Sequence, residues 1–311
     1  MNLINEASPH FHGKGSTQWI MGMVCLALLP TLVASLVLYG PGAPLLVLVC
    51  IATALVCEHV CCLIMHREST AGDLSCVVTA MLFAFTLPAT CSYFAAILGT
   101  AFAIVVVKML FGGIGCNFAN PAVAGRVFVM VALPSALTSY PDVVGKPLDA
   151  ITGATPLAMT ASGTALPYSL MDMLLGNHAG ALGETCVLTL LIGFIFLLVI
   201  RVVDAWATVP FIATVAVITG IAGEDVAMQL LSGGLALGAF FMATDYTTTP
   251  MTAKGKIIFG IGCGLITSLV RLFAAAPEGV AFSILFMNLF VPLIDRYTRP
   301  NPAGGVKHAL I

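Results

Sequence analysis

Long apolar runs recur along the whole of this chain, and they constrain its fold more than any other feature. A run of about 20 such residues is long enough for a helix to cross the hydrocarbon core of a bilayer. Charged residues make up only 8% of the 311 residues, whereas soluble domains carry about 25%. A soluble domain with so few charges cannot keep its surface hydrated. The sequence therefore predicts an all-α polytopic membrane protein.

These runs predict ten transmembrane helices. They lie near residues 19–38, 45–65, 74–88, 93–111, 121–138, 182–200, 206–222, 226–243, 257–274 and 279–295. We expect a first membrane segment at residues 19–138 and a second at residues 182–295. A polar loop at residues 139–181 separates them, and residues 1–18 and 296–311 flank them. The amino-terminal segment lacks the ordered regions of a cleavable signal peptide, so we expect the first span to be retained.

The basic residues predict how these spans are oriented. With a cytoplasmic amino terminus, most lysines and arginines fall on or near the inner side, in accord with the positive-inside rule. Those residues are Lys14, Arg67, Lys108, Arg126, Arg201, Lys254, Lys256, Arg296, Arg299 and Lys307. Only Lys146 and Arg271 fall outside. Both termini are therefore expected in the cytoplasm, and residues 139–181 on the extracytoplasmic side.

A weak internal repeat relates the two membrane segments. Phe83–Pro88 is followed by Lys108–Gly113, which begins twenty residues after Pro88. The second half has a similar pair of segments, Phe240–Thr244 with Pro250 and then Arg271–Ala276. The spacing from Pro250 to Arg271 is nearly the same as that from Pro88 to Lys108. Because each half has an odd number of spans, the two halves have opposite orientations in the membrane. Inverted repeats of this kind place functional sites near the pseudo-two-fold axis, often at short or interrupted helices.

The polar loop contains the most informative short motif, Asp149-x-x-Thr152-Gly153-Ala154-Thr155. Glycine punctuates ordinary turns, so one interpretation is a simple turn. The spacing also resembles the acceptor sites of flavin transferases, which join FMN through its phosphate to a threonine hydroxyl. In that interpretation Thr155 carries FMN, while Gly153 and Ala154 leave room for the transferase. Asp149 would position the flavin donor or its metal, and we favour this interpretation because of its spacing and the extracytoplasmic location.

Three further motifs make a family resemblance specific. They are Gly112–Ala122, Gly176–Thr185 and Phe240–Pro250, the last followed by Gly255-Lys256. Together with Ser8-Pro9-His10 and the flavin loop, they resemble the D subunit of the Rnf electron-transport complex across essentially the whole chain. The B subunit of the sodium-pumping NADH:quinone reductase is a related family with a longer amino-terminal extension. Only about eighteen residues precede the first span here, which favours the Rnf family.

This resemblance implies a ten-helix fold similar to that of urea channels, built from two inverted halves. It implies FMN on Thr155 and a second, non-covalent flavin, riboflavin, within the membrane part. The Rnf complex passes electrons between reduced ferredoxin and NAD, coupled to Na+ or H+ movement across a bacterial or archaeal cytoplasmic membrane. The implied partners are an outer-face subunit that bears FMN and cytoplasmic subunits that bind iron–sulfur clusters and NAD. A flavin transferase is needed for maturation, and no nucleic-acid partner is expected.

The chain itself lacks the usual nucleotide-binding and cluster-binding motifs. It has no Gly-x-Gly-x-x-Gly after a strand and no P-loop, so nucleotide chemistry is assigned to partner subunits. It has ten cysteines but no Cys-x-x-Cys pair at zinc or cluster spacing. Most of them lie in apolar spans, where a free cysteine behaves as a small hydrophobic residue. We therefore expect no iron–sulfur cluster and no structural disulfide.

The Gly112–Ala122 segment is a candidate site for the second flavin. Asn117 and Asn120 would bind it through amide hydrogen bonds near the inner face. Gly112 and Gly113 would let a flat ring approach the backbone closely. The alternative is that a glycine-rich helix end only permits tight helix packing.

Several ionisable residues at membrane depth are functional candidates. Asp245 lies among threonines, and an oxygen-rich set of Asp245, Thr247 and Thr248 would suit a hard cation such as Na+. The alternative is that this aspartate and these hydroxyls cap irregular backbone. Glu184 is predicted at the positive end of the sixth helix, and Glu58, inside the second span, must be paired or protonated.

Two other functions compete with the flavin-bearing subunit. A small-solute channel or secondary transporter of urea-channel-like fold would suit the repeat and the number of spans equally well. A structural anchor without a cofactor is the other alternative. The flavin loop separates the first function from both, because neither has a use for an exposed phosphoester acceptor.

Overall fold

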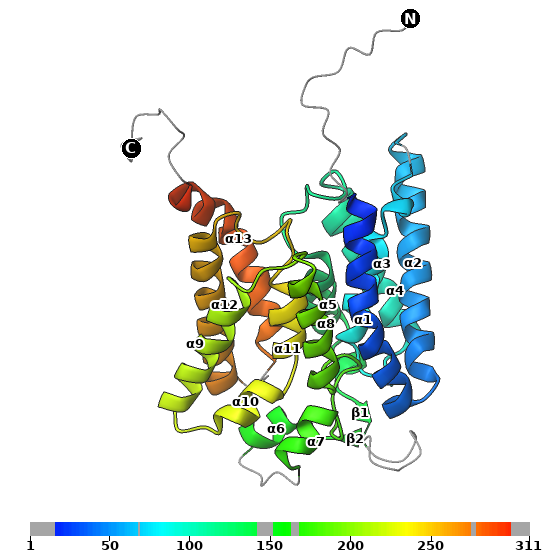
Figure 1. Ribbon diagram of the computed structural model, residues 1–311. Helices are drawn as coiled ribbons and strands as arrows, with labels where there is room; N and C mark the ends of the chain where they lie inside the picture. Colours follow the sequence, from blue (N-terminus) through cyan, green and yellow to red (C-terminus); the bar gives the residue numbers. More distant parts are fainter. Residues whose placement is uncertain (1–15, 68, 142–151, 163–167, 275–277, 300–311) are drawn as a thin grey trace, which may run out of the picture.

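The computed structural model describes residues 16–67, 69–141, 152–162, 168–274 and 278–299, and it is mostly helical (Figure 1). The first half comprises α1 (Thr17–Tyr39), α2 (Gly42–Ile64), η1 (Ala71–Asp73), α3 (Ser75–Phe85), α4 (Tyr93–Ala101), the π-helical η2 (Phe102–Met109), α5 (Pro121–Ala132) and η3 (Pro134–Leu137). The second half comprises α8 (Val187–Val199), α9 (Thr208–Ile221), α10 (Val226–Leu231), α11 (Leu235–Leu237), the π-helical η4 (Gly238–Met242), α12 (Ala253–Phe273) and α13 (Val280–Thr298). Between the halves lie β1 (Tyr140–Pro141), β2 (Thr152–Gly153), α6 (Pro156–Ala161) and α7 (Leu170–Leu175).

The helices coincide with the predicted apolar spans. In the described part of the chain, α1, α2, α12 and α13 are long and apolar enough to cross a membrane. The shorter apolar helices are α3, α4 with η2, α5, α8 and α9. The eighth span is divided among α10, α11 and η4. The prediction of an all-α class is confirmed, while the ten crossings and the inverted relation of the halves stay predictions.

The sixth span differs most from its predicted boundary, because α8 begins only at Val187. Before that residue the chain is not helical. The backbone N–H groups of Leu182 and Gly183 donate to the carbonyl oxygens of Leu87 and Phe85, at 2.9 and 2.8 Å. A Cβ atom on Gly183 would lie 2.4 Å from the Cβ of Phe85. The segment therefore fills the space beyond the end of α3, and glycine permits that contact.

Two other spans end or break early for local reasons. α5 ends at Ala132, six residues before the predicted end at residue 138. Pro134 follows closely, and a proline disfavours helical backbone at the residue before it. The predicted helix at residues 226–243 breaks between α10 and α11, where Gly233 has φ +65°. Glycine takes this left-handed conformation without steric strain.

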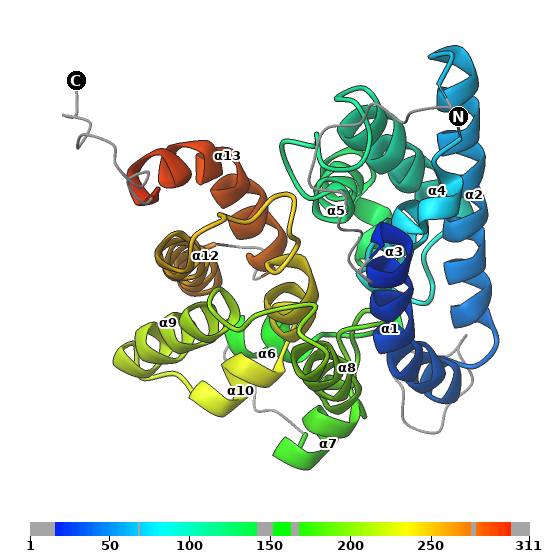
Figure 2. The same cartoon turned by 45° about the horizontal axis from the view of Figure 1, so that its top comes forward.

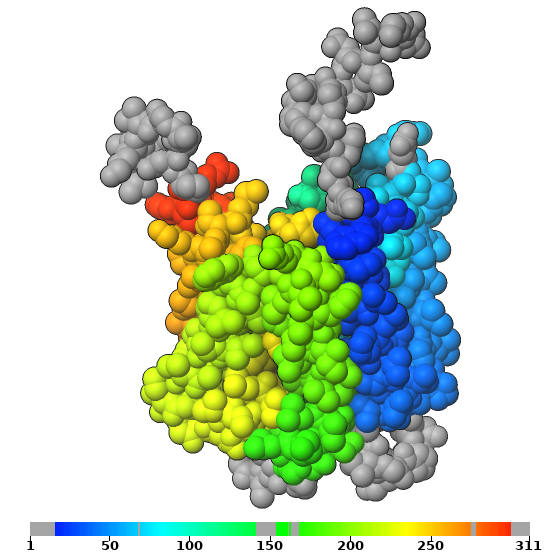
Figure 3. Space-filling view, in the orientation of Figure 1, coloured from blue at the N-terminus to red at the C-terminus, as the bar shows by residue number. Residues whose placement is uncertain are grey.

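The two halves lie side by side, as Figures 1 and 2 both show. They meet where α1 packs against α8 and where α5 packs against α13. A Cβ atom on Gly193 of α8 would lie 2.3 Å from the carbonyl oxygen of Ala27 in α1. Small residues at such contacts let membrane helices approach closely. The space-filling view in Figure 3 accordingly shows the surface of α1 in direct contact with the green second-half surface.

The two ends of the molecule differ. In Figure 1, α1 begins and α13 ends at the top, while α6, α7, α10 and the β1–β2 ribbon lie at the bottom. We name these the inner end and the outer end, after the orientation that the basic residues predict. Many large apolar side chains are exposed on the helices between them, among them Val37 and Ile221 at 77% and 83% exposure. Such a surface is suited to contact with lipid.

One ion pair is deeply buried within the first half. Lys108 of η2 lies 2.7 Å from a carboxylate oxygen of Glu58 on α2, and both side chains are buried. Lys108 also donates to the hydroxyl of Ser75 at 2.8 Å, and Thr70 donates to the other carboxylate oxygen of Glu58. The prediction that Glu58 must be paired or protonated is confirmed by this pair. The ten cysteines of the chain are all free thiols.

Candidate functional site

The flavin motif lies at the outer end of the molecule. Thr155 is the N-cap residue of α6, where its hydroxyl oxygen accepts a hydrogen bond from the backbone N–H of Ala158 at 3.3 Å. Threonine is a preferred N-cap and proline a preferred first helical residue, so the sequence Thr155-Pro156 begins a helix here. Thr155 is half-buried and Ala154 is exposed. The hydroxyl therefore lies close to an open surface.

The rest of the motif is only partly described. Thr152 and Gly153 form β2 and pair with Pro141 and Tyr140 of β1. Asp149 lies outside the described residues. The ribbon fixes the chain immediately before Thr155, so Thr155 lies between a short strand pair and a helix.

The glycine-rich segment lies at the inner end, between η2 and α5. Gly112, Gly113 and Gly115 have φ values of +123°, +96° and +85°, which favour glycine and turn the chain sharply. Asn120 ends the segment as the N-cap of α5, accepting hydrogen bonds from the N–H groups of Ala122 and Val123 at 3.0 and 3.3 Å. The segment is thus a tight loop that leads into a capped helix.

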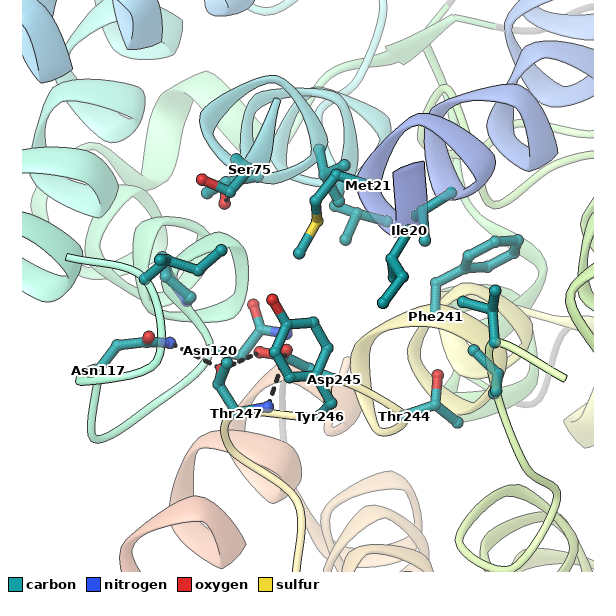
Figure 4. Close-up of a pocket in the computed structure, with 18 of the residues that line it drawn as sticks. Ile20, Met21, Ser75, Asn117, Asn120, Phe241, Thr244, Asp245, Tyr246 and Thr247 are labelled. Atoms are coloured by element: carbon teal, nitrogen blue, oxygen red, sulfur yellow. Dashed lines mark hydrogen bonds between the residues drawn. The ribbon is translucent and has the colours of Figure 1, made fainter. Parts of the chain in front are cut away.

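Next to this loop is a cavity of about 790 Å³, here called the inner cavity (Figure 4). Apolar side chains of α1 and α3, together with Phe241, line part of its wall. Its polar lining consists of Ser75, Thr79, Lys108, Asn117, Asn120, Thr244, Asp245, Tyr246 and Thr247. The lining comes from both halves of the chain. The cavity is therefore located at the junction of the halves, near their inner end.

Hydrogen bonds join the two predicted groups of residues inside this cavity. The amide N–H₂ of Asn117 donates to the hydroxyl of Thr247 and to the carbonyl oxygen of Ala119, both at 3.2 Å. The Asp245 carboxylate accepts from the hydroxyls of Thr247 and Thr248 at 3.0 and 3.1 Å. The candidate second-flavin residues and the candidate ion ligands thus meet at one place, although they were predicted separately.

The predicted residues contribute unequally to the cavity. Asn120 uses its amide oxygen to cap α5 and its N–H₂ group to reach the carbonyl oxygen of Met242 at 3.2 Å, so much of its hydrogen-bonding capacity is structural. Gly112 and Gly113 shape the loop and do not line the cavity. Thr248 is buried behind Asp245. Asn117, Asp245 and Thr247 therefore present the polar groups of this motif to the cavity.

Sequence reasoning missed several lining residues. Ser75 belongs to no motif that pointed to a site, and Tyr246 lies in the Phe240–Pro250 motif but was given no role. Lys108 was used only to predict orientation and the internal repeat. A basic residue inside an apolar span was an available signal for Lys108, because such residues are rare and face protein interiors. For Ser75 the sequence offers no comparable signal.

A second cavity, of about 470 Å³, lies at the outer end and is here called the outer cavity. Four charged side chains line it: Arg126, Glu184, Arg271 and Glu278. Arg126 pairs with Glu278, and the hydroxyl of Tyr140 donates to the same carboxylate at 2.7 Å. Arg271 donates to the backbone carbonyl oxygens of Gln229 and Ser232. Leu157 of α6, two residues after Thr155, lines the same cavity.

Two groups of this cluster that lie in outer loops have shifted pKa values. Burial raises the pKa of the Tyr140 hydroxyl above its usual value, and the neighbouring Glu278 carboxylate raises it further. Burial would raise the pKa of Glu278, but Arg126 and the Tyr140 hydroxyl outweigh burial and hold this pKa below its usual value. Glu278 therefore stays ionised as the partner of Arg126.

Glu184 does not have the position that its sequence predicts. It precedes Cys186, the N-cap of α8, by two residues, so it is not in the first turn of the helix. Its side chain lines the outer cavity, and the residue is only 7% exposed. The helix was expected to start earlier because apolar residues already surround Glu184. The apolar pattern does not show that Leu182 and Gly183 instead form hydrogen bonds at the end of α3.

Comparison with known proteins gives a full-length match. The model of the NQR2, RnfD, RnfE family matches residues 4–304. A protein of Acetobacterium woodii, the D subunit of the Na(+)-translocating ferredoxin:NAD(+) oxidoreductase complex, is 40% identical over 311 residues, covering 99% of this chain and 97% of its own length. The proton-translocating counterpart of Clostridium ljungdahlii is 36% identical, with 96% and 95% covered. The D subunit of the ion-translocating oxidoreductase complex of Stutzerimonas stutzeri is 35% identical, with 94% and 93% covered.

Proposed function

Because this chain belongs to the NQR2, RnfD, RnfE family, we propose that it is the D subunit of an ion-translocating ferredoxin:NAD+ oxidoreductase and relays electrons across the membrane. The full-length similarity to named D subunits supports the complex. The observation that carries the electron-relay role is the flavin motif at the outer end. Its Thr155 caps α6 next to an open surface. In this proposal the chain spans the membrane ten times, as two inverted halves of a urea-channel-like fold.

The first flavin of the proposal is FMN, joined through its phosphate to the hydroxyl of Thr155. The residues fit this group, because Ala154 is exposed and the threonine hydroxyl lies near the surface. A transferase can therefore reach the acceptor from outside. Beneath it, the outer cavity contains buried guanidinium nitrogens without partners among the described residues. A covalent bond keeps a cofactor that would otherwise be lost to the extracytoplasmic space.

The second flavin of the proposal is riboflavin in the inner cavity. The inner cavity is mostly apolar with a few convergent polar groups, as cofactor sites are. Asn117, Asp245 and Thr247 provide those groups, and Phe241 and Tyr246 provide aromatic faces. These flavins supply electron-transfer chemistry when bound, and the residues of the chain bind and orient them at opposite ends. The partners would be an outer-face subunit with FMN and cytoplasmic subunits with iron–sulfur clusters and an NAD site.

The first test is to look for the covalent flavin directly. The chain is expressed together with a flavin transferase, purified and denatured, and its flavin fluorescence is measured in a gel. Mass spectrometry then covers the peptide Asp149–Leu157. We expect a fluorescent band and an added mass of one FMN, less water, on Thr155. An unmodified peptide, with the transferase active on a control acceptor, would reject the proposal in favour of a solute channel or transporter.

We also propose that Asp245 binds the coupling cation, Na+ or H+. Replacing Asp245 with asparagine keeps the side chain's size but removes its charge, so a hard cation loses its strongest oxygen ligand. We expect the cation concentration for half-maximal activity of the assembled complex to rise roughly tenfold or more, a loss of about 1.4 kcal/mol. Asp225→Asn at the N-cap of α10 is the matched control, since asparagine caps helices as well as aspartate. Unchanged cation dependence in Asp245→Asn would exclude this residue as an ion ligand.

A further inference from the structure

The outer cavity contains buried polar atoms that find no partner in the described part of the chain. Arg126 Nη1 and Arg271 Nε make no hydrogen bond there, although both atoms are buried. The Glu184 carboxylate, in a residue that is 7% exposed, forms no ion pair with any described residue and has a hydrogen bond only to the backbone of Ala181. Leaving such groups unsatisfied is unfavourable, and native structures contain few of them. Two unpartnered guanidinium nitrogens and a carboxylate without an ion pair in one cavity indicate a partner other than the described residues.

The unpartnered groups define what that partner must offer. The two guanidinium groups are donors only, and an ionised carboxylate is an acceptor only. Their ligand must therefore present acceptors to Arg126 and Arg271 and a donor to Glu184. A simple anion would satisfy the arginines but not the glutamate, and a simple cation would do the reverse.

Two glycines leave room for a ligand in the outer cavity. A Cβ atom on Gly234 would lie 2.7 Å from a carboxylate oxygen of Glu184. A Cβ atom on Gly233 would lie 3.4 Å from Nη2 of Arg271. Both glycines are at the break between α10 and α11. Side chains at either position would therefore crowd the polar groups of the cavity.

The cavity also lies within reach of Thr155. Leu157 lines it and lies close to Gly233 and so to Arg271. Thr155 is the N-cap of the same short helix, so its hydroxyl is within one helical turn of the cavity wall. The phosphate and ribityl chain of FMN form a linker of about eight bonds, which spans about 9 Å at the extension of a polypeptide backbone. A flavin on Thr155 can thus place its ring in this cavity.

We propose that the outer cavity binds the isoalloxazine ring of the flavin carried on Thr155, with Glu184 accepting its imide N–H and Arg126 and Arg271 donating to the flanking carbonyl oxygens. The inference rests on the proposed function. The pyrimidine edge of the ring offers carbonyl, N–H and carbonyl in sequence, which complements the guanidinium donors of Arg126 and Arg271 and the carboxylate acceptor of Glu184. Leu237, Met242 and Val280 provide apolar walls for the rest of the ring.

These residues then set the redox potential of the flavin. Reduction adds negative charge to the ring, so a nearby guanidinium favours it and a nearby carboxylate opposes it. Glu184→Gln is expected to raise the midpoint potential of the covalent flavin, and Arg271→Gln is expected to lower it. We expect each shift to be about tenfold in the one-electron equilibrium, or about 59 mV. Glu224→Gln, an exposed glutamate at the same end, is the matched control and leaves the potential unchanged.

The experiment uses the full chain, co-expressed with a flavin transferase and freed of non-covalent flavin. Three quantities are measured: covalent flavin per chain, its midpoint potential, and quenching of its native fluorescence by iodide. Opposite potential shifts, with a ring shielded from iodide in the unsubstituted protein, support the inference. If every variant carries covalent flavin but neither potential shift is seen, or if iodide quenches the ring freely, the ring does not bind in the outer cavity. Attachment to Thr155 would still stand in either case. Absence of covalent flavin from the unsubstituted chain rejects the proposed function, and the inference with it. Because iodide quenching needs no substitution, the inference stays testable if a variant fails to fold.

Discussion

Replacing Thr155 with valine is expected to abolish covalent flavin in this protein while leaving its helical fold in place. Valine matches threonine in shape but lacks the hydroxyl that a phosphoester requires, so no bond to FMN can form. The structural effect is local, because Thr155 caps only the short helix α6. Losing an N-cap residue destabilises a helix by about 1 kcal/mol. In-gel flavin fluorescence and the mass of the Asp149–Leu157 peptide measure the result.

Two control variants make this prediction specific. Thr160→Val removes another threonine hydroxyl of α6, one that only donates to the backbone carbonyls of Pro156 and Leu157. It is expected to retain covalent flavin at the level of the unsubstituted protein. Thr155→Ser restores a hydroxyl at the acceptor position and should recover part of the modification. Covalent flavin at normal level in Thr155→Val would show that the acceptor is elsewhere.

The sequence predicts the helices of this protein well, because each depends on a local property. A run of apolar residues long enough to cross a bilayer is visible in any window of the chain. The predicted spans at residues 19–38 and 45–65 accordingly match α1 and α2 to within a few residues. The spans at residues 182–200 and 226–243 match less well. There, Gly183 and Gly233 permit backbone contacts and turns that a count of apolar residues does not include.

The sites are harder to predict, because their residues come together only in three dimensions. Asn117 and Thr247 are 130 positions apart and hydrogen-bonded, and no local pattern relates them. The motifs around each were nonetheless distinctive enough to be singled out separately. The outer cavity was not predicted, since Arg126 and Arg271 lie in different halves and nothing in the sequence related them to Glu184, which was singled out alone. What the sequence lacks is the pairing of the halves, which brings α5, α12 and the Glu184 segment to one cavity.

Replacing Lys108 with methionine is expected to destabilise the protein strongly. Methionine fills much of the same volume, but it leaves the Glu58 carboxylate buried without its cation. Breaking a buried ion pair from one side destabilises a protein by about 3–5 kcal/mol, because the remaining charge is uncompensated. The Ser75 hydroxyl also loses its donor. Thermal unfolding of the purified chain in detergent, followed by circular dichroism, measures the loss.

The double variant Glu58→Gln with Lys108→Met separates the charge effect from a packing effect. It removes both charges, and replacing a buried ion pair by neutral residues is often nearly neutral for stability. Its melting temperature should therefore lie much closer to that of the unsubstituted protein than that of Lys108→Met alone. Lys256→Met is the matched control, since its pair with Asp204 is partly exposed and such pairs contribute at most about 1 kcal/mol. If the double variant were as unstable as Lys108→Met, lost packing around the lysine chain would explain the effect, and the buried carboxylate would not.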